Sequence, residues 1–326
     1  MIKKTTPAAT FAEQVVQNRI DRGHWLLQLR DTLDWKPLES KLERLYSKDQ
    51  GRPAYPPLAL FRILLLQRWH NLSDPGVVEY LRYHLLFLEF AGLSVEDAPP
   101  DDTTLVVFRK RLAGAGLERW AFGYFTKELE KKGLMVKEGS LVDATMVQAA
   151  VKPQARRRDG DPQDEDARWG KKSKKSPWTF SYKAHAAVDK GSLLIREVAV
   201  TAGNVHDSRM MGVVSREEEK AVWADKAYAS EDRRGRLKDR GVAARLLFRA
   251  ARGTPLRGWQ VRLNKIWAKA RAPVEGAFAS MKRWCGMPRI RYLGMAGARI
   301  QVYLAALAHN LKRMTTLQRA AAEVRA

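Results

Sequence analysis

Residues 140–147 read Ser140-Leu141-Val142-Asp143-Ala144-Thr145-Met146-Val147, and residues 221–225 read Ala221-Val222-Trp223-Ala224-Asp225. The first is a short run with mixed strand and turn chemistry, and the second is a short apolar run that ends in an acid, so both are read as β-strands. Each run carries one aspartate, Asp143 inside the first and Asp225 at the end of the second. The two runs therefore predict strands that each bring a carboxylate to a sheet.

A β-hairpin is predicted between these two runs. Residues 180–188 alternate between the faces of a strand, residues 193–200 form a second strand, and Asp189-Lys190-Gly191 supplies a tight turn. The segments that follow the hairpin are a short helix, the strand at 221–225, a helix from Ser230 to Gly241, a strand at 242–248, and helices at 266–283 and 297–320. This order predicts an α/β fold, with a mixed sheet flanked by helices.

The part of the chain before this sheet reads as helical. Prolines 56 and 57 begin a helix that is apolar on nearly all sides and is therefore expected to be buried. Ser73 is the expected N-cap of the next helix. We expect an all-α N-terminal domain over residues 1–135 and the α/β domain over residues 136–326.

One helix of the N-terminal domain is strongly basic. Asp102 opens it, and Arg109, Lys110 and Arg111 follow one another beside apolar positions of the same helix. Such a helix can present cations to a DNA groove. An ordinary helical bundle with solvated charges accounts for the pattern equally well, and both interpretations stay open.

The chain carries a large positive charge. It has 59 Lys and Arg against 36 Asp and Glu, which gives a formal net charge of 59 − 36 = +23. Self-repulsion of that size favours a polyanionic partner, and nucleic acid is the usual one. The basic loop predicted at 152–178, with Arg156–Arg158 and Lys171–Lys175, either follows DNA or is simply a solvated, disordered segment.

Cysteine content and hydropathy exclude several classes of protein and of metal site. Cys285 is the only cysteine, so neither an intramolecular disulfide nor a cysteine-based zinc site can form. Residues 1–10 lack the apolar core of a signal peptide, and the apolar stretch 58–66 is too short to cross a bilayer. We expect a cytoplasmic, nucleoid-associated protein with no membrane partner.

Three acids are the candidate catalytic and metal-binding residues: Asp143, Asp225 and Glu275. Open sheets bind ligands beyond the carboxyl ends of their strands, so these side chains are expected to meet there. Three carboxylates repel one another unless cations neutralise them, and magnesium prefers oxygen ligands. Two such ions can activate an attacking oxygen and stabilise a leaving oxygen in phosphodiester chemistry.

Two cations accompany the third acid. Arg271 lies four residues before Glu275 and Lys282 lies seven residues after it, a spacing that puts all three on one helix face. Arginine suits bidentate phosphate contacts and lysine a point contact, so both are candidate DNA-binding residues. Pro273 lies inside this segment, where a helix either begins or kinks.

Over nearly its whole length the chain resembles bacterial insertion-sequence transposases of the IS-five type, within the DDE group. The residues that carry the resemblance are Val142-Asp143-Ala144-Thr145, Ser181–His185, Thr201–Ser208, Ala224-Asp225-Lys226-Ala227-Tyr228, the spaced Arg271, Glu275 and Lys282, and the N-terminal stretch Tyr55–Leu112. The family has a tyrosine where this chain has Ala268, with Trp267 adjacent. That departure concerns contacts with DNA ends more than metal binding.

The resemblance implies an RNase H-like catalytic domain that cleaves transposon ends and joins the 3′-hydroxyl to target DNA. It implies two Mg²⁺ ions, which Mn²⁺ can replace, and double-stranded DNA partners, namely terminal inverted repeats and target DNA. A homodimer or higher oligomer is implied because two ends must be joined. Two alternatives stay open, an RNase H-like nuclease without strand transfer and a domesticated, non-catalytic DNA-binding protein.

Overall fold

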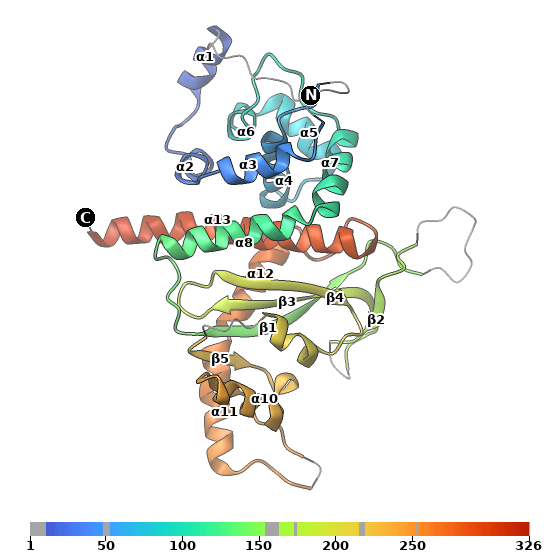
Figure 1. The fold of residues 1–326 in the computed structure, drawn as a ribbon, viewed down its shortest axis with the longest axis vertical. Coiled ribbons are helices and arrows are strands. Elements are labelled where there is room, and N and C mark those ends of the chain that lie inside the picture. Colours follow the sequence, from blue (N-terminus) through green and yellow to red (C-terminus); the bar gives the residue numbers. More distant parts are fainter. Residues whose placement is uncertain are drawn as a thin grey trace. The chain divides into compact units, whose positions relative to one another are not determined.

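The structure is a computed structural model that describes residues 11–47, 53–153, 163–172, 175–214, 219–251 and 253–325. The chain divides into two compact units. We call Met1–Phe122 with Trp284–Gly286 the helical unit, and Gly123–Arg283 with Met287–Ala326 the sheet unit. Figure 1 shows helices alone in the first and a sheet with helices in the second, which confirms the predicted fold class.

A nearly all-round apolar helix forms the centre of the helical unit. This helix, α4 (Pro57–Trp69), begins after Pro56 and buries twelve of its thirteen residues, as its sequence predicts. The other helices that begin in this unit are α1 (Phe11–Arg19), α2 (Trp25–Thr32), α3 (Lys36–Glu43), α5 (Asp74–Tyr83), α6 (Leu85–Ala91), α7 (Asp102–Gly114) and α8 (Leu117–Lys131).

Side-chain caps determine where two of these helices begin. The Ser73 hydroxyl accepts a hydrogen bond from the backbone N–H of Gly76 at the start of α5, which confirms the predicted cap. The Asp101 carboxylate does the same for Thr104 at the start of α7. Each cap satisfies a backbone N–H that has no partner inside its own helix.

The sheet of the second unit is mixed. Its strands are β1 (Ser140–Gln148), β2 (Arg168–Gly170), β3 (Thr179–Asp189), β4 (Ile195–Ala202), β5 (Ala221–Ala224) and β6 (Ala243–Leu246). The order across the sheet is β2-β3-β1-β5-β6, and β4 also pairs with β3. Strand β3 is antiparallel to both β1 and β4, whereas β5 and β6 run parallel to β1, as expected for an RNase H-like domain.

Part of the predicted loop at 152–178 is ordered, which corrects that expectation. It contains β2, which pairs with the start of β3. The Asp164 carboxylate is buried and accepts hydrogen bonds from the backbone N–H of Ala167 and from the Tyr182 hydroxyl. A strand this short cannot show the alternating apolar and polar pattern of a β-strand in its sequence. Its pairing with β3 therefore determines its structure. Arg156–Arg158, and residues 173 and 174 of the predicted Lys171–Lys175 run, lie outside the described residues.

The predicted helix at 266–283 is two helices, α11 (Gly258–Arg271) and α12 (Pro273–Trp284). Pro273 begins the second one, because proline lacks the N–H and its ring clashes with the preceding turn inside a helix. The first begins eight residues earlier than the predicted start at residue 266. The last helix, α13 (Gly294–Arg325), is also longer than the predicted 297–320.

Helices lie on the sheet and close its core. Figure 1 shows α13 running along β4. The Asn310 side chain of α13 bonds both backbone groups of Ile195 in β4.

The short elements η1 (Asp207–Met210), α9 (Met211–Val214), η2 (Lys226–Tyr228) and α10 (Glu231–Asp239) connect the later strands. Val142, Ala224, Tyr228 and Leu237 share one buried cluster. Within the described ranges, none of the helices combines the length and apolar content of a membrane span.

Candidate active site

Asp143 and Asp225 come from adjacent parallel strands. The β1–β5 ladder ends at the pair Val142–Ala224, and the next residue on each side is an aspartate. Because paired positions of neighbouring strands lie side by side, Asp143 and Asp225 occupy neighbouring positions on the two adjacent strands. The Asp225 charge also raises the pKa of Asp143, which agrees with this proximity.

The Asp143 side chain is largely buried, with 22% of its surface exposed. Its Oδ1 accepts a hydrogen bond from the backbone N–H of Ala144 at 2.9 Å, and its Oδ2 accepts one from Arg271 Nη1 at 2.7 Å. Burial raises the pKa of Asp143, because a desolvated carboxylate loses hydration, whereas the Arg271 charge lowers it. The net direction of the pKa shift is upward, because burial outweighs the Arg271 charge.

Asp225 is held by the backbone rather than by a side chain. It follows the last residue of β5 and caps η2, where its Oδ1 accepts a hydrogen bond from the N–H of Lys226 at 2.7 Å. The short buried strand and the turn after it determine the direction of this carboxylate. It therefore stays at the end of the strand, although no ion pair orients it within the described part of the chain.

Glu275 lies in the first turn of α12, and its side chain is 72% exposed. The opposite face of α12 anchors the helix through the buried residues Val274, Ala277, Phe278 and Met281. Arg271 Nη2 lies 3.7 Å from Glu275 Oε1. The Arg271 guanidinium is therefore shared between Asp143 and Glu275, the first and third of the predicted acids.

The donor set suits a hard divalent cation, although the three acids do not converge on one point. Among the residues described, no group of three or more His, Cys, Asp or Glu side chains is arranged to hold a metal ion. Asp143 and Asp225 nevertheless offer oxygen ligands at neighbouring positions, and such ligands fit Mg²⁺. The positively charged Arg271 side chain already binds Asp143 and lies near Glu275.

The two predicted DNA-binding residues of this segment belong to different helices, but Arg271 keeps the predicted i,i+4 neighbourhood with Glu275 across the break between them. Arg271 ends α11, whereas Lys282 lies in α12 with Glu275. Burial lowers the pKa of Lys282, and the positive charge of Lys172 lowers it further. Lys282 therefore lies close enough to Lys172 for positive charge from two distant parts of the sequence to gather there.

Of the three basic residues predicted on α7, Arg109 is not at the surface. It is only 6% exposed, and its two terminal nitrogens donate to Asp74 at 2.7 and 2.5 Å. We therefore assign Arg109 to the contact between α5 and α7 and not to DNA. Lys110 and Arg111 are exposed, as a role at a DNA surface requires.

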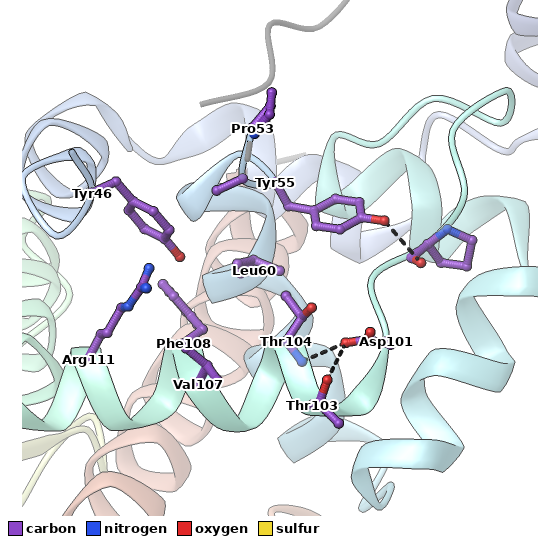
Figure 2. Close-up of a pocket in the computed structure, with 12 residues that line it drawn as sticks. Tyr46, Pro53, Tyr55, Leu60, Asp101, Thr103, Thr104, Val107, Phe108 and Arg111 are labelled. Carbon is purple, nitrogen blue, oxygen red and sulfur yellow. Dashed lines mark hydrogen bonds between the residues drawn. The ribbon is translucent and has the colours of Figure 1, made fainter. Parts of the chain in front are cut away.

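Arg111 lines a pocket of about 610 Å³ in the helical unit. Figure 2 shows its guanidinium close to Tyr46, and its carbon centre lies 4.8 Å from the centroid of that ring. Across the pocket the Tyr55 hydroxyl donates to the backbone oxygen of Ala98 at 3.0 Å. None of the predicted acids lines this pocket, which is therefore separate from the candidate active site.

Two residues near the carboxylates were absent from the predicted site. Tyr228 is 1% exposed, and its hydroxyl has no hydrogen-bond partner among the described residues. Burial raises the pKa of Tyr228, and the charges of Asp207 and Asp143 raise it further. Asp207 in turn binds Lys183 at 2.9 Å. Both residues lie in the sequence motifs that carry the resemblance, which is the signal that would have identified them.

The sequence matches two family models. Residues 135–311 match a model described as "Transposase DDE domain", and residues 14–111 match one described as "Transposase domain (DUF772)". No solved structure matches the chain. The first match covers more than half of the chain and includes all three acids, and the second covers most of the helical unit. The chain belongs to the family of transposases with a DDE domain.

Proposed function

We propose that this transposase cleaves the ends of an insertion sequence of the IS-five type and joins the freed 3′-hydroxyl to target DNA. Asp143, Asp225 and Glu275 are the proposed catalytic residues and metal ligands. The observation that carries the proposal is the adjacent position of the two aspartates at the end of the β1–β5 ladder, with Arg271 between Asp143 and Glu275.

Divalent ions are the proposed cofactor, because DDE transposases typically use them and because the donor set consists of carboxylates. Mg²⁺, or Mn²⁺ in its place, would activate the attacking oxygen and stabilise the leaving oxygen of an in-line displacement. Asp143 and Asp225 would hold this charge at the sheet, since backbone N–H groups already orient one oxygen of each. Glu275 would complete the set from α12.

Arg271 is proposed to bind DNA as well as carboxylate. Its guanidinium neutralises Asp143 in the structure and has a buried Nε with no partner among the described residues. A phosphate group offers the same bidentate oxygen geometry as a carboxylate, so a DNA strand can compete with Asp143 for this side chain. Lys282, Lys110 and Arg111 are proposed as further phosphate contacts.

The proposed division of labour follows the two family matches. Residues 1–135 would bind DNA or assemble the complex, and residues 136–326 would carry out the chemistry. The partners would be the terminal inverted repeats and the target duplex. A homodimer or higher oligomer is proposed, because one reaction has to join two transposon ends.

A cleavage and strand-transfer assay with Mg²⁺ and DNA that contains the ends of the element tests this proposal. Wild type is compared with Asp225→Asn and Glu275→Gln, and with Asp232→Asn as the control. Asp232 is an exposed acid on α10 whose ion pair is with Arg236 at 3.0 Å, so its change tests charge removal alone. We expect both site variants to lose cutting and joining while they retain DNA binding, and the control to keep activity.

Three outcomes would contradict the proposal. Equal activity in the site variants would remove the three acids from the mechanism. Cut DNA without joined product would favour a nuclease without strand transfer. Binding without chemistry in every sample, with the correct ends supplied, would favour a non-catalytic DNA-binding protein.

A further inference from the structure

Helix α11 is unusual among the longer helices of the structure because none of its residues is buried. Its fourteen residues include Arg262, Lys265, Lys269 and Arg271 and no acid. A helix in a folded protein normally buries one stripe of side chains against a core. The position of α11 and its exposed face therefore require another explanation.

One face of α11 is anchored by the chain that follows β6. The Asn264 side chain bonds both backbone groups of Phe248, accepting from its N–H at 2.8 Å and donating to its oxygen at 3.0 Å. The Phe248 ring stacks on Trp267 at 5.5 Å between centroids and meets Trp259 edge-on at 5.2 Å. We call Asn264, Trp267 and Arg271 the inner row, and its last member contacts Asp143.

The opposite face of α11 carries Arg262, Lys265 and Lys269, which we call the cationic row. The spacing of three and then four residues puts them on one side of the helix, as it does for the inner row. The two rows are offset by two residues, which is about 200° around a helix with 3.6 residues per turn. All three side chains are exposed, and none forms an ion pair within the described part of the chain.

Such a row lowers the stability of the isolated chain. Like charges three or four residues apart on a helix repel each other. No acid in α11 compensates for them, and the contacts with Phe248 hold the helix on the other side. A binding partner that carries regularly spaced negative charge would remove this repulsion, and the phosphate backbone of DNA has that property.

We propose that the cationic row of α11 binds the phosphate backbone of duplex DNA, next to the place where one DNA strand reaches Asp143. The inner row supports this position, because the same helix that presents the cations also delivers Arg271 to the carboxylates. The inference rests on the proposed function in one respect, namely that DNA is brought to these acids. Its test measures binding alone and requires no cleavage.

The test is the salt dependence of DNA binding in the presence of a chelator, with a random-sequence duplex as the probe. The variant changes Arg262, Lys265 and Lys269 to glutamine in the full chain. The matched control changes Lys127, Lys132 and Lys238 to glutamine, which removes the same charge from exposed positions on other parts of the fold. Circular dichroism and thermal unfolding verify that both variants are folded.

The slope of log K against log salt should become less steep by about 0.9 for each phosphate that the protein no longer neutralises, and so by up to about three in the row variant. The control should show less than half of that change. A duplex with the element's terminal sequence should respond in the same way, because phosphate contacts do not read sequence. A single charge reversal, Lys265→Glu, should weaken binding further than the neutral change at that position.

An unchanged slope in the row variant, or an equal change in the control, would overturn the inference while the proposed function stands. If circular dichroism shows that the triple variant has lost helix, the DNA binding of Lys265→Glu, which keeps two of the three cations, tests the inference instead. Failure of the wild type to bind any duplex would contradict both the inference and the proposed function. Cleavage defects with normal binding in the row variant would also overturn the inference, and would point to the carboxylates.

Discussion

At the scale of single residues, the site is organised around a shared cation. Arg271 donates to Asp143 and lies within ion-pair distance of Glu275, while Asp225 is oriented by its own backbone turn. Burial and the neighbouring acid raise the pKa of Asp143, and Arg271 opposes both. The charge state of Asp143 is thus linked to where the Arg271 side chain binds.

Replacing Arg271 with glutamine should raise the pKa of Asp143 further in metal-free protein. The reason is that the change removes the positive charge that favours the ionised carboxyl, while burial and Asp225 still favour the protonated form. At a given acidic pH a larger fraction of Asp143 would then be protonated and unable to bind a cation. Carbon NMR of the carboxyl groups measures this pKa, and a decrease in the variant would refute the assignment.

Two buried tyrosines that differ in their hydrogen bonds allow a matched comparison of the free energy of unfolding. The Tyr182 hydroxyl donates to the buried Asp164 carboxylate, whereas the Tyr228 hydroxyl has no partner among the described residues. Tyr182→Phe should lower the free energy of unfolding by about 1.5–3 kcal/mol, the usual contribution of a hydrogen bond to a charged group. Tyr228→Phe should leave it unchanged or raise it by about 1 kcal/mol, since an unsatisfied buried donor disappears. Urea denaturation compares them, and an equal loss in both would be inconsistent with an unpaired Tyr228 hydroxyl.

At the scale of elements, paired side chains and proline decide how helices meet and end. Pro273 separates α11 from α12, and Asn264 and Phe248 attach α11 to the chain that follows β6. In the helical unit, Asp74 at the start of α5 binds Arg109 in the middle of α7. A buried charge of this kind is tolerated because its partner is in place.

Removing Asp74 should be more damaging than removing Arg109, because the Arg109 side chain is only 7% exposed, whereas the Asp74 side chain is 19% exposed and keeps its hydrogen bond from Gln67. Asp74→Ala removes the carboxylate that the buried Arg109 guanidinium binds, and breaking a buried pair in this way costs about 3–5 kcal/mol of unfolding free energy. Arg109→Met replaces the charge by an apolar side chain of similar length and should cost less. Chemical denaturation of the two variants gives the difference. A DNA-binding loss confined to Arg109→Met, with stability unchanged, would restore Arg109 as a surface contact.

At the scale of the whole molecule, the excess of positive charge affects every stability measurement. The formal net charge is +23, so the folded chain repels itself at low ionic strength. The buried pairs Arg196–Glu219 and Asp74–Arg109 are shielded from salt, while exposed cations such as those of α11 are not.

The melting temperature should accordingly rise as sodium chloride is added from low to physiological strength, where the screening length is about 8 Å. Duplex DNA should give a similar rise at low salt and less at high salt, because binding to the native state stabilises it and salt weakens that binding. A thermal-shift series with both additives measures this. A melting temperature that falls with salt would show that attractive ion pairs, not repulsion, dominate.

The sequence by itself determined the features that depend on neighbours along the chain. Alternation predicted the β3–β4 hairpin, Ser73 predicted the start of α5, and the apolar α4 predicted its own burial, since each signal lies within a short stretch of chain. The order of strands and helices then predicted the mixed sheet. The spacing of Arg271, Glu275 and Lys282 and the order of the acids predicted the family.

Only the tertiary structure decided which side chains meet. It ended the β1–β5 ladder directly before Asp143 and Asp225, and it turned Arg271 onto a carboxylate 128 residues away in sequence. It buried Arg109 against Asp74 and left its neighbours Lys110 and Arg111 exposed. It also ordered β2 through Asp164 and Tyr182. These outcomes depend on contacts between distant segments, whose partners are determined by how whole elements pack and not by local sequence period.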